Sequence, residues 1–311
     1  MAKYISLLGA PCGLGGRDQG TAQGPETLVS AGLPEYLRAR GHTVHYQDLK
    51  EWTRDGGGDL SIWGSDEVSE ENPKHVKRIA EANRVIAAHA FKAHLLGGLP
   101  VVLGGDHAVV MGSIAQGMVA HRKRFGLIWL DAHYDVHTHL TSTSHNANGM
   151  PFAAVMGHGH PEFLSFIRAP YLEGKDVLHV GGGNLYCEPE EFAFLKEHGI
   201  RSFPMSVIRK RIRFVCDELQ AFIDAHDAIH VSCDIDVLHR RSAPGVDYPS
   251  HNGMSLSCAR HLAKLLGKSG KVTSLDVVEY KPSADHWNKK GQPTTAASIM
   301  TLLGDFLGSS K

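Results

Sequence analysis

The sequence predicts an α/β fold with three layers, in which helices cover both faces of a mostly parallel sheet. Short apolar runs recur along the chain, and they alternate with longer segments in which apolar residues repeat about every 3.6 positions. The short runs are apolar at consecutive positions, which is typical of strands that are buried on both faces. Alternation of such strands with helices specifies a parallel sheet between two helical layers.

The expected elements follow one another as strand, loop and helix. The expected strands comprise residues 4–8, 43–46, 101–103, 126–130, 177–180, 229–233 and 272–277. The expected helices comprise residues 25–39, 73–96, 111–121, 189–198, 206–225, 256–266 and 294–306. Residues 53–72 have no regular pattern, and we expect them to form a surface excursion. Because no linker composition separates two parts, we expect a single domain over residues 1–311.

Composition and charge exclude several classes of function. The chain has 32 Lys and Arg against 33 Asp and Glu, so it lacks the basic field that nucleic acids and anionic membranes require. No apolar stretch approaches the roughly 20 residues that span a bilayer, and no signal peptide precedes the first strand. The 5 Cys residues are widely spaced and odd in number, which favours a reducing compartment. We therefore expect a cytoplasmic protein that acts on a small molecule.

Acidic residues and histidines directly follow three of the expected strands. The sequences Gly-Gly-Asp-His, Asp-Ala-His-Tyr-Asp and Asp-Ile-Asp begin at residues 104, 131 and 234, each after an apolar run. In an extended segment, positions i, i+2 and i+4 point to the same side, so alternate side chains of these motifs converge. The carboxyl ends of parallel strands meet at one edge of a sheet, where ligands commonly bind. The six candidate metal ligands are His107, Asp131, His133, Asp135, Asp234 and Asp236.

The ligand types indicate two divalent cations rather than one. Carboxylates and imidazoles without a thiolate suit ions that accept mixed oxygen and nitrogen coordination, and they argue against a structural zinc site. Four carboxylates around one ion leave an excess of negative charge, whereas two ions balance it and could share Asp131 and Asp234 as bridges. The alternative is that each Asp caps the turn or helix after its strand. Three such strand ends in one chain favour the metal site.

A glycine-rich segment, Gly13-Leu14-Gly15-Gly16, follows the first strand and has some likeness to a dinucleotide-binding loop. The third glycine of the pattern Gly-x-Gly-x-x-Gly would fall at position 18, which is Asp18. We therefore expect a turn that brings the backbone close to the site, and no bound dinucleotide.

At these positions the sequence resembles the arginase or ureohydrolase family. The three metal motifs, the last of them within residues 232–236, are similar to the three signatures of that family. The segment Asp276-Val277-Val278-Glu279 is similar to the one that carries its guanidinium-binding glutamate, and the likeness spans nearly the whole chain. The resemblance implies an arginase-like fold, a homo-oligomer (trimer or hexamer), and hydrolysis of a guanidino or formimino group with two Mn²⁺ ions.

The resemblance also implies how the ligands are shared. One ion would be held by His107, Asp131, Asp135 and Asp234, and the other by Asp131, His133, Asp234 and Asp236. A hydroxide between the ions would attack the guanidinium carbon, because metal binding lowers the pKa of water. Asp135 would hold this hydroxide and relay its proton, and Glu279 would pair with the planar guanidinium.

Loop residues point to L-arginine, which would be hydrolysed to L-ornithine and urea. Arginases bind the amino-acid end of their substrate with a Ser-x-Asn pair and a later acidic residue. Here Ser144 and Asn146 match the pair for the α-carboxylate, and Glu188 or Glu191 matches the acid for the α-ammonium. The alternative for these residues is a polar surface loop in which Glu188 caps a helix.

Two departures from the arginase pattern leave other functions open. Asn148 occupies the substrate-site position of a proton-shuttling histidine, and an amide cannot transfer a proton. His137, which replaces a carboxylate-binding asparagine, and His145 are the candidate replacements. Residues 243–249 resemble formimidoylglutamase, so that activity is the runner-up, together with hydrolysis of agmatine or another guanidino acid. A metal-binding protein without catalysis is the third hypothesis, and the retained acidic ligands argue against it.

Overall fold

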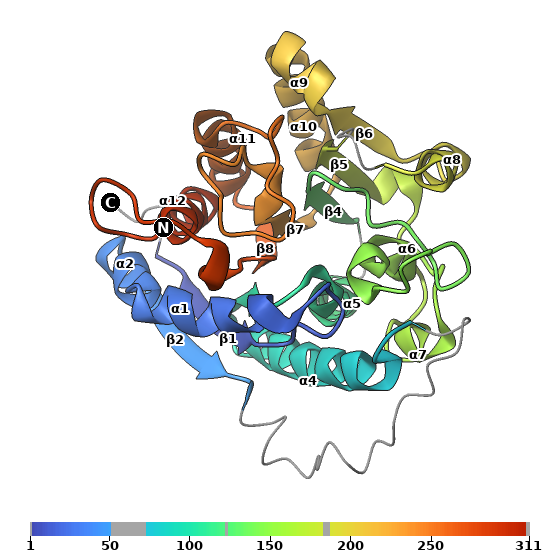
Figure 1. Cartoon of the computed structure of the whole chain (residues 1–311), viewed down its shortest axis with the longest axis horizontal. Coiled ribbons are helices and arrows are strands. Elements are labelled where there is room, and N and C mark those ends of the chain that lie inside the picture. The colour runs from blue at the N-terminus through green and yellow to red at the C-terminus, as the bar shows by residue number, and fades with distance from the viewer. Residues whose placement is uncertain (1, 51–72, 122–123, 183–186, 309–311) are drawn as a thin grey trace.

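The computed structural model describes residues 2–50, 73–121, 124–182 and 187–308, and the irregular segment 53–72 lies outside them. The described strands form one parallel sheet in the order β2-β1-β3-β8-β7-β4-β5-β6 (Figure 1). They are β1 (Tyr4–Ala10), β2 (Thr43–Asp48), β3 (Leu99–Gly104), β4 (Phe125–Leu130), β5 (Val177–Gly181), β6 (Arg201–Pro204), β7 (Ala228–Asp234) and β8 (Val272–Val278).

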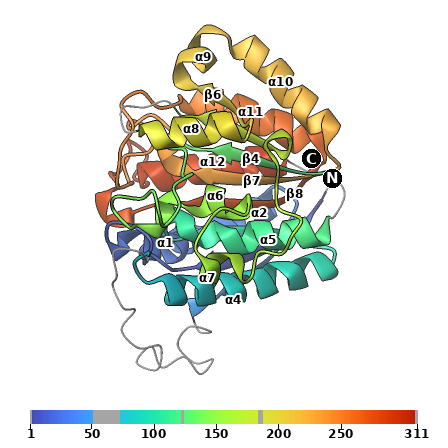
Figure 2. The ribbon, with the colours of Figure 1, turned by 90° about the vertical axis from the view of Figure 1, so that its right-hand side faces the viewer.

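Helices cover both faces of this sheet, as Figures 1 and 2 show. The first face carries α1 (Gly24–Ser30), α2 (Leu33–Ala39), α9 (Met205–Lys210), α10 (Ile212–Ala225), α11 (Leu256–Ser269) and α12 (Thr294–Leu307). The second face carries α4 (Val76–Leu95), α5 (Val110–Ala120), α6 (Pro151–Val155), α7 (Pro161–Leu164) and α8 (Pro189–Glu197). The predicted three-layer α/β fold with a parallel sheet is therefore confirmed.

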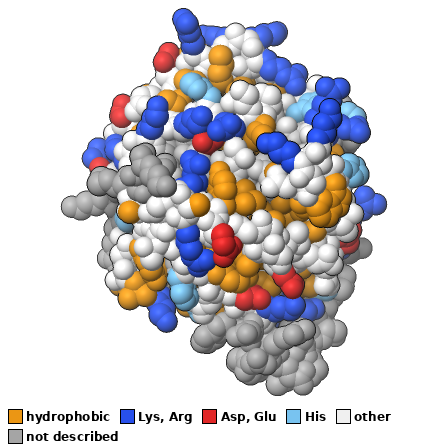
Figure 3. All heavy atoms as spheres, turned by 90° about the vertical axis from the view of Figure 1, so that its left-hand side faces the viewer, with side chains coloured by type: hydrophobic (Ala, Val, Ile, Leu, Met, Phe, Trp, Pro, Cys, Tyr) orange, Lys and Arg blue, Asp and Glu red, His pale blue; other side chains and the backbone are white. Residues whose placement is uncertain are grey.

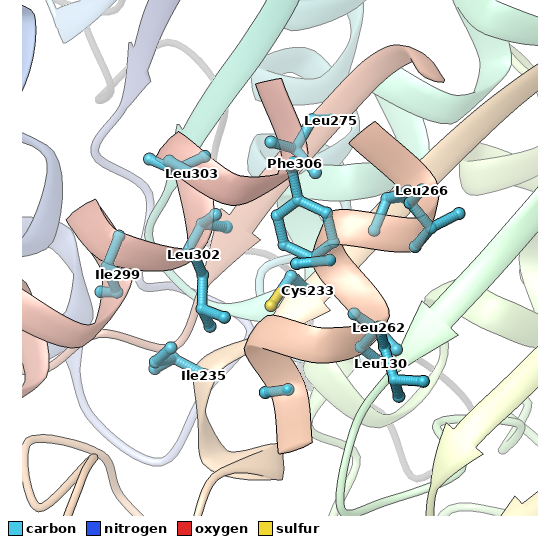
Figure 4. Packing of buried hydrophobic residues seen from close by; sticks show 14 of the residues in the cluster. Leu130, Cys233, Ile235, Leu262, Leu266, Leu275, Ile299, Leu302, Leu303 and Phe306 are labelled. Carbon is cyan, nitrogen blue, oxygen red and sulfur yellow. The ribbon is translucent and has the colours of Figure 1, made fainter. Parts of the chain in front are cut away.

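The core lies in two layers because side chains alternate across each buried strand. Leu7 belongs to the first layer and Leu8 to the second, and Leu103 and Val102 divide in the same way. Figure 4 shows how side chains from α11 and α12 close over β7 and β8. On the face in Figure 3, by contrast, charged side chains stand on the outside with smaller apolar groups between them.

The structure corrects two of the predicted helices and adds three elements that were not predicted. The helix expected at 25–39 is two helices, because Gly32 has a left-handed φ of 89° and Pro34 starts a new helix beyond it. The helix expected at 206–225 breaks at Arg211, where φ is -139°. Strand β6 was not predicted, because only Phe203 of its four residues is buried and no apolar run marks it. The short helices α6 and α7 were also missed.

None of the helices in the described part of the chain is long and apolar enough to cross a membrane. The four central strands β3, β8, β7 and β4 are neighbours, although two of them come from the last third of the sequence. The chain passes directly from β3 to β4 and later returns to insert β7 and β8 between them. The carboxyl ends of these four strands therefore form one continuous edge, which is where α/β sheets bind ligands.

The turn after β3 is packed too tightly to accept a side chain at Gly105. A Cβ there would lie 1.7 Å from the carbonyl oxygen of Cys12, which itself accepts a hydrogen bond from the backbone nitrogen of Asp106. We expect Gly105→Ala to lower the free energy of unfolding by about 1–3 kcal/mol or more. Urea denaturation in the presence of a chelator would measure this without a contribution from bound metal.

The matched control is Gly16→Ala in the neighbouring glycine-rich segment. A Cβ at Gly16 would meet its nearest atom at 3.5 Å, an ordinary contact distance. The control should change the stability by less than about 0.5 kcal/mol. Equal stability of the two variants would contradict the tight packing inferred at Gly105.

Candidate metal centre

The six predicted ligands come from three neighbouring strand ends and meet in one place. His107 follows β3, and the ligands at 131, 133 and 135 follow β4. Asp234 ends β7, and Asp236 lies in the turn directly after it. Asp131 and His107 are 0% and 1% exposed, so they lie at the bottom of the site. Asp135 has a positive φ of 51°, a backbone conformation that non-glycine residues rarely adopt and that is often found at functional sites.

Three carboxylates surround the Nδ1 atom of His107. Its distances to the Oδ2 atoms of Asp135, Asp131 and Asp234 are 2.8, 3.1 and 3.3 Å. None of these contacts has the geometry of a hydrogen bond, so this buried nitrogen has no hydrogen-bond partner in the described structure. An atom of this kind, facing acidic oxygens, is well suited to share a cation with them.

A second group of ligands lies on the other side of Asp131. His133 Nδ1 is 3.0 Å from Asp236 Oδ2 and 3.5 Å from Asp131 Oδ1, so the two oxygens of Asp131 face different histidines. The potential ligand atoms form two sets, and within each set the atoms lie within 4.8 Å of one another. They are His107, Asp131 and Asp135, and Asp131, His133 and Asp236.

The carboxylates strongly perturb the pKa values of the cluster. Burial, followed by the charge of Asp131, raises the pKa of Asp135 to about 7. Burial and the charges of Asp236 and Asp131 raise the pKa of Asp234 well above its ordinary value. Burial opposes a charge on His107, but its three carboxylate neighbours raise its pKa well above the ordinary value. Without a metal, the site must therefore take up protons to balance its acidic charge.

The donor set fits two divalent cations. Buried carboxylates and imidazoles converge, no thiolate is present among them, and Asp131 presents an oxygen to each group. Asp234 also caps the turn after its strand, which was the alternative to metal binding. Its Oδ1 atom accepts a hydrogen bond of 2.8 Å from the Asp236 nitrogen. Its Oδ2 atom still faces His107, so capping and metal binding use different oxygens.

An aromatic stack supports the ligands and was not predicted. Trp129 donates a hydrogen bond of 2.9 Å from Nε1 to Asp131 Oδ2. Its ring is stacked between His107 and Phe152, with centroid distances of 4.2 and 4.8 Å. The sequence signal was present, since Trp129 precedes Asp131 by two positions and therefore points to the same side of β4.

Glu279 lies in the same site, after the end of β8. Its Oε1 atom accepts hydrogen bonds from the backbone nitrogen of His107 at 2.8 Å and from Asn148 Nδ2 at 3.3 Å. Burial, followed by the charge of Asp106, raises the pKa of Glu279 to about 8. The glycine-rich segment is close by, because Gly15 donates a hydrogen bond from its backbone to Asp106. This agrees with the turn expected there.

A cavity of about 320 Å³ opens above the ligands. His137 lines it, with Nε2 at 3.6 Å from Glu188 Oε2 and 4.0 Å from Glu191 Oε1. His145 is not among the residues that line the cavity. Its backbone oxygen accepts a hydrogen bond from the backbone nitrogen of Lys74. The predicted residues that line the cavity are His133, Asp135, His137, Ser144, Asn146, Asn148, Glu188, Glu191, Asp234, Asp236 and Glu279. Val246, Asp247 and Tyr248 also line it and were not predicted as site residues.

The two glutamates at the rim have different structural roles. Glu188 precedes α8, and its backbone nitrogen donates a hydrogen bond of 2.9 Å to Glu191 Oε2. Glu191 is buried, and the hydrogen bond that its carboxylate accepts stabilises the start of the helix. The side chain of Glu188 remains 43% exposed beside the cavity. The helix cap considered for Glu188 thus exists as a reciprocal capping box, in which the side chains of both Glu188 and Glu191 accept backbone hydrogen bonds.

Comparison with known proteins identifies the family. The model of the arginase family matches residues 3–306. This chain belongs to the arginase family. It is 33% identical to the arginase of Bacillus caldovelox, with 98% of each chain covered, and 33% identical to that of Bacillus subtilis, with 98% of this chain and 99% of the relative covered. The family prediction made from the three motifs is therefore confirmed.

Solved structures of the arginase family agree with this assignment. The crystal structure of the Bacillus caldovelox arginase superposes with a TM-score of 0.87 at 30% identity, and 99% of each chain is covered. The formimidoylglutamase of Bacillus subtilis has a TM-score of 0.73 at 20% identity, covering 98% of this chain and 86% of its own, which shows a shared fold alone.

The raised pKa of Glu279 predicts how the stability of the metal-free protein depends on pH. In the folded state Glu279 keeps its proton up to about pH 8, whereas the ordinary value is 4.5. Between these values the folded state binds more protons than the unfolded state, so this group's contribution to the free energy of unfolding falls as pH rises. Glu279→Gln keeps an oxygen for both hydrogen bonds and removes the titration.

The variant should therefore gain stability relative to wild type as the pH increases from about 5 to 8. Urea denaturation of both proteins in excess chelator, at several pH values in this range, would measure the difference. A difference that is constant with pH would contradict the raised pKa of Glu279.

Proposed function

We propose that this protein hydrolyses L-arginine to L-ornithine and urea at a binuclear manganese centre. The observation that carries the proposal is the pair of ligand groups that share Asp131, with Glu279 in the same cavity. Membership of the arginase family supports the reaction, as do the whole-length relatives that bear the name arginase. The mixture of carboxylate and imidazole ligands suits Mn²⁺.

One set of residues is proposed to bind the metal ions, and another set is proposed to bind the substrate. The proposed ligands are His107, Asp131, His133, Asp135, Asp234 and Asp236. When bound, two divalent ions polarise water and supply a nucleophile near neutral pH. Asp135, whose side chain lines the cavity, is placed to accept and relay a proton during attack.

Glu279 is the proposed partner of the guanidinium group. Its two observed hydrogen bonds, from His107 and Asn148, both use Oε1, so neither occupies Oε2. A planar cation can therefore be bound by the carboxylate while the backbone keeps the side chain in position. This negative charge also offsets the repulsion between a cationic substrate and two metal ions.

The amino-acid end of the substrate is proposed to lie at the rim of the cavity. Ser144 and Asn146 offer polar groups for the carboxylate, and Glu188 offers a charge for the ammonium. His137 lies beside Glu188, so it can contribute to carboxylate binding or to proton transfer. We assign proton transfer to His137 rather than His145, because His137 lines the cavity.

Hydrolysis of formiminoglutamate is the second candidate. Val246 and Tyr248 belong to the segment that resembles formimidoylglutamase, and both line the cavity. Part of that segment therefore contacts the substrate space, and its composition can influence the choice of substrate. Several further properties stay predictions: a single domain, a homo-oligomer, a cytoplasmic location, and the absence of nucleic-acid and membrane partners.

The metal requirement can be tested with Asp131→Ala. Asp131 faces both histidines, so its removal should lower the manganese content from two ions per chain to at most one and abolish urea release from L-arginine. Metal analysis after dialysis and a urea assay would measure both effects. Asp217→Ala, at an exposed position on α10, is the control and should keep both properties. Full activity of Asp131→Ala would refute the proposed centre.

The substrate can be tested with a panel of L-arginine, agmatine, guanidinobutyrate, guanidinopropionate and formiminoglutamate. We expect kcat/KM to be highest for L-arginine, with urea as the product. Formamide released from formiminoglutamate as the best substrate would overturn the assignment and leave the metal site intact.

Glu188→Ala tests how the α-ammonium is recognised. It should lower kcat/KM for L-arginine about 10- to 100-fold, the effect of losing one charge-assisted hydrogen bond. Guanidinobutyrate lacks the ammonium and should be affected far less. Glu190→Ala, at an exposed position of the same helix, is the control. Equal losses for the two substrates would remove Glu188 from this role.

A further inference from the structure

A second cavity, of about 630 Å³, lies beside the substrate cavity and is rich in basic side chains. Two residues, Asp247 and Tyr248, line both cavities, so the cavities share a wall. This basic cavity is built from residues other than the six proposed metal ligands. Its size is that of cavities which bind small molecules. The basic residues that line it are Arg240, Arg241, His251 and His286.

The backbone that carries the two arginines is held by hydrogen bonds. The nitrogen of Arg240 donates one of 2.8 Å to the Ser250 oxygen. The nitrogen of Arg241 donates one of 3.1 Å to His239 Nδ1, and the nitrogen of His239 donates one of 2.8 Å to the Met254 oxygen. The guanidinium groups therefore project from a fixed loop, and only their side chains must be ordered when a ligand binds.

The two arginines lack a carboxylate partner in the part of the chain that the structure describes. The guanidinium of Arg240 contacts the ring of His251, with Nη1 at 3.0 Å from Nε2, and Arg241 has no ion pair among the described residues. Asp247 is the acidic residue of the lining, and its Oδ1 atom is 2.6 Å from Lys281 Nζ. Because that carboxylate is already paired, the charge of the two arginines stays available to a ligand.

The pKa of a neighbouring histidine reflects the same excess of positive charge. Burial, followed by the charge of Arg241, lowers the pKa of His239 below its ordinary value. Arg209 and Arg240 act in the same direction. Arg209 is held nearby, because its Nη2 atom donates a hydrogen bond of 2.8 Å to the Asn252 oxygen. A bound anion would offset the mutual repulsion of these groups.

The chemistry of the lining selects an anion with two charges. A guanidinium binds carboxylate and phosphate oxygens through paired, charge-assisted hydrogen bonds. Two such groups at successive positions match two negative charges better than one. The imidazoles of His251 and His286 can donate further hydrogen bonds. Exposed charges on a convex surface are worth little because water and salt screen them, whereas these four groups line one cavity.

We propose that the basic cavity binds a small dianion, with phosphate or dicarboxylate groups, through Arg240 and Arg241. The bound anion would lie against the wall formed by Asp247 and Tyr248, on the side opposite the substrate. The site is separate from the metal centre, and the proposal does not require hydrolysis of L-arginine.

The experiment is isothermal titration calorimetry of the full-length protein with inorganic phosphate, succinate and acetate at low ionic strength. A pH of about 7.5 keeps most of the phosphate in its doubly charged form. Wild type should bind one phosphate per chain in the basic cavity, both with and without Mn²⁺, and acetate should bind about 10-fold more weakly or worse. Equal binding of phosphate and succinate would assign the cavity to dianions in general, and binding of one alone would assign it to that group.

The decisive variant is Arg241→Ala. It should raise the dissociation constant for phosphate at least about 10-fold, with or without Mn²⁺, because it removes charge-assisted hydrogen bonds. Arg241 is exposed, and thermal denaturation would verify that the variant folds. Arg241→Gln keeps most of the length of the side chain and should give the same result if the alanine variant is unstable. Arg213→Ala, at an exposed position of α10, removes the same charge elsewhere and should change the constant less than about twofold.

Three results would overturn the proposal. They are equal dissociation constants for wild type and Arg241→Ala, the absence of binding below about 10 mM phosphate, and phosphate binding that requires Mn²⁺. The last result would place the anion at the metal centre. Failure of wild type to bind Mn²⁺ would instead overturn the proposed function and leave the anion site intact.

Discussion

The concentration of acidic charge at one edge of the sheet is the constraint on which the structure depends. Asp131 and Asp234 are almost fully buried. Each has a carboxylate oxygen within a few ångströms of the same atom, His107 Nδ1. Such charges are stable in a protein interior only when cations or protons balance them. The raised pKa values of Asp135 and Asp234 express the same demand in the metal-free state. The two proposed divalent cations would satisfy it while leaving the carboxylates ionised.

The central strands of the sheet bring this charge together at their carboxyl ends. Strands β3, β4, β7 and β8 are central neighbours, buried on both faces, and each ends in residues of the site. Beneath the ligands, Trp129 and the hydroxyl of Ser232, which is hydrogen-bonded to Asp276, satisfy the outer atoms of Asp131 and His107. Ligands whose hydrogen bonds are already arranged lose little conformational freedom when a metal binds. The core of the sheet thus serves the chemistry as well as the stability.

In the proposed function, substrate recognition depends on a different part of the molecule. The rim of the cavity is built by loops and by the start of α8, where His137 lies beside Glu188. Asn148 donates a hydrogen bond to Glu279 and so helps to position the side chain that we propose as the guanidinium partner. His137 and Asn148, which depart from the arginase pattern, both line the cavity, and the proposed ligand groups below them are complete. This separation lets substrate choice vary while the metal chemistry stays the same.

The amino-acid sequence by itself determined the fold class, the family and the six residues that meet at the metal centre. It could do so because buried strands, their alternation of side chains and the ligands at their ends are local patterns. Only the tertiary structure decided the break at Gly32, the edge strand β6, the position of His145 outside the cavity, and the pairing of Ser232 with Asp276. These features depend on contacts between distant segments, and residues 232 and 276 become neighbours only through the register of β7 and β8.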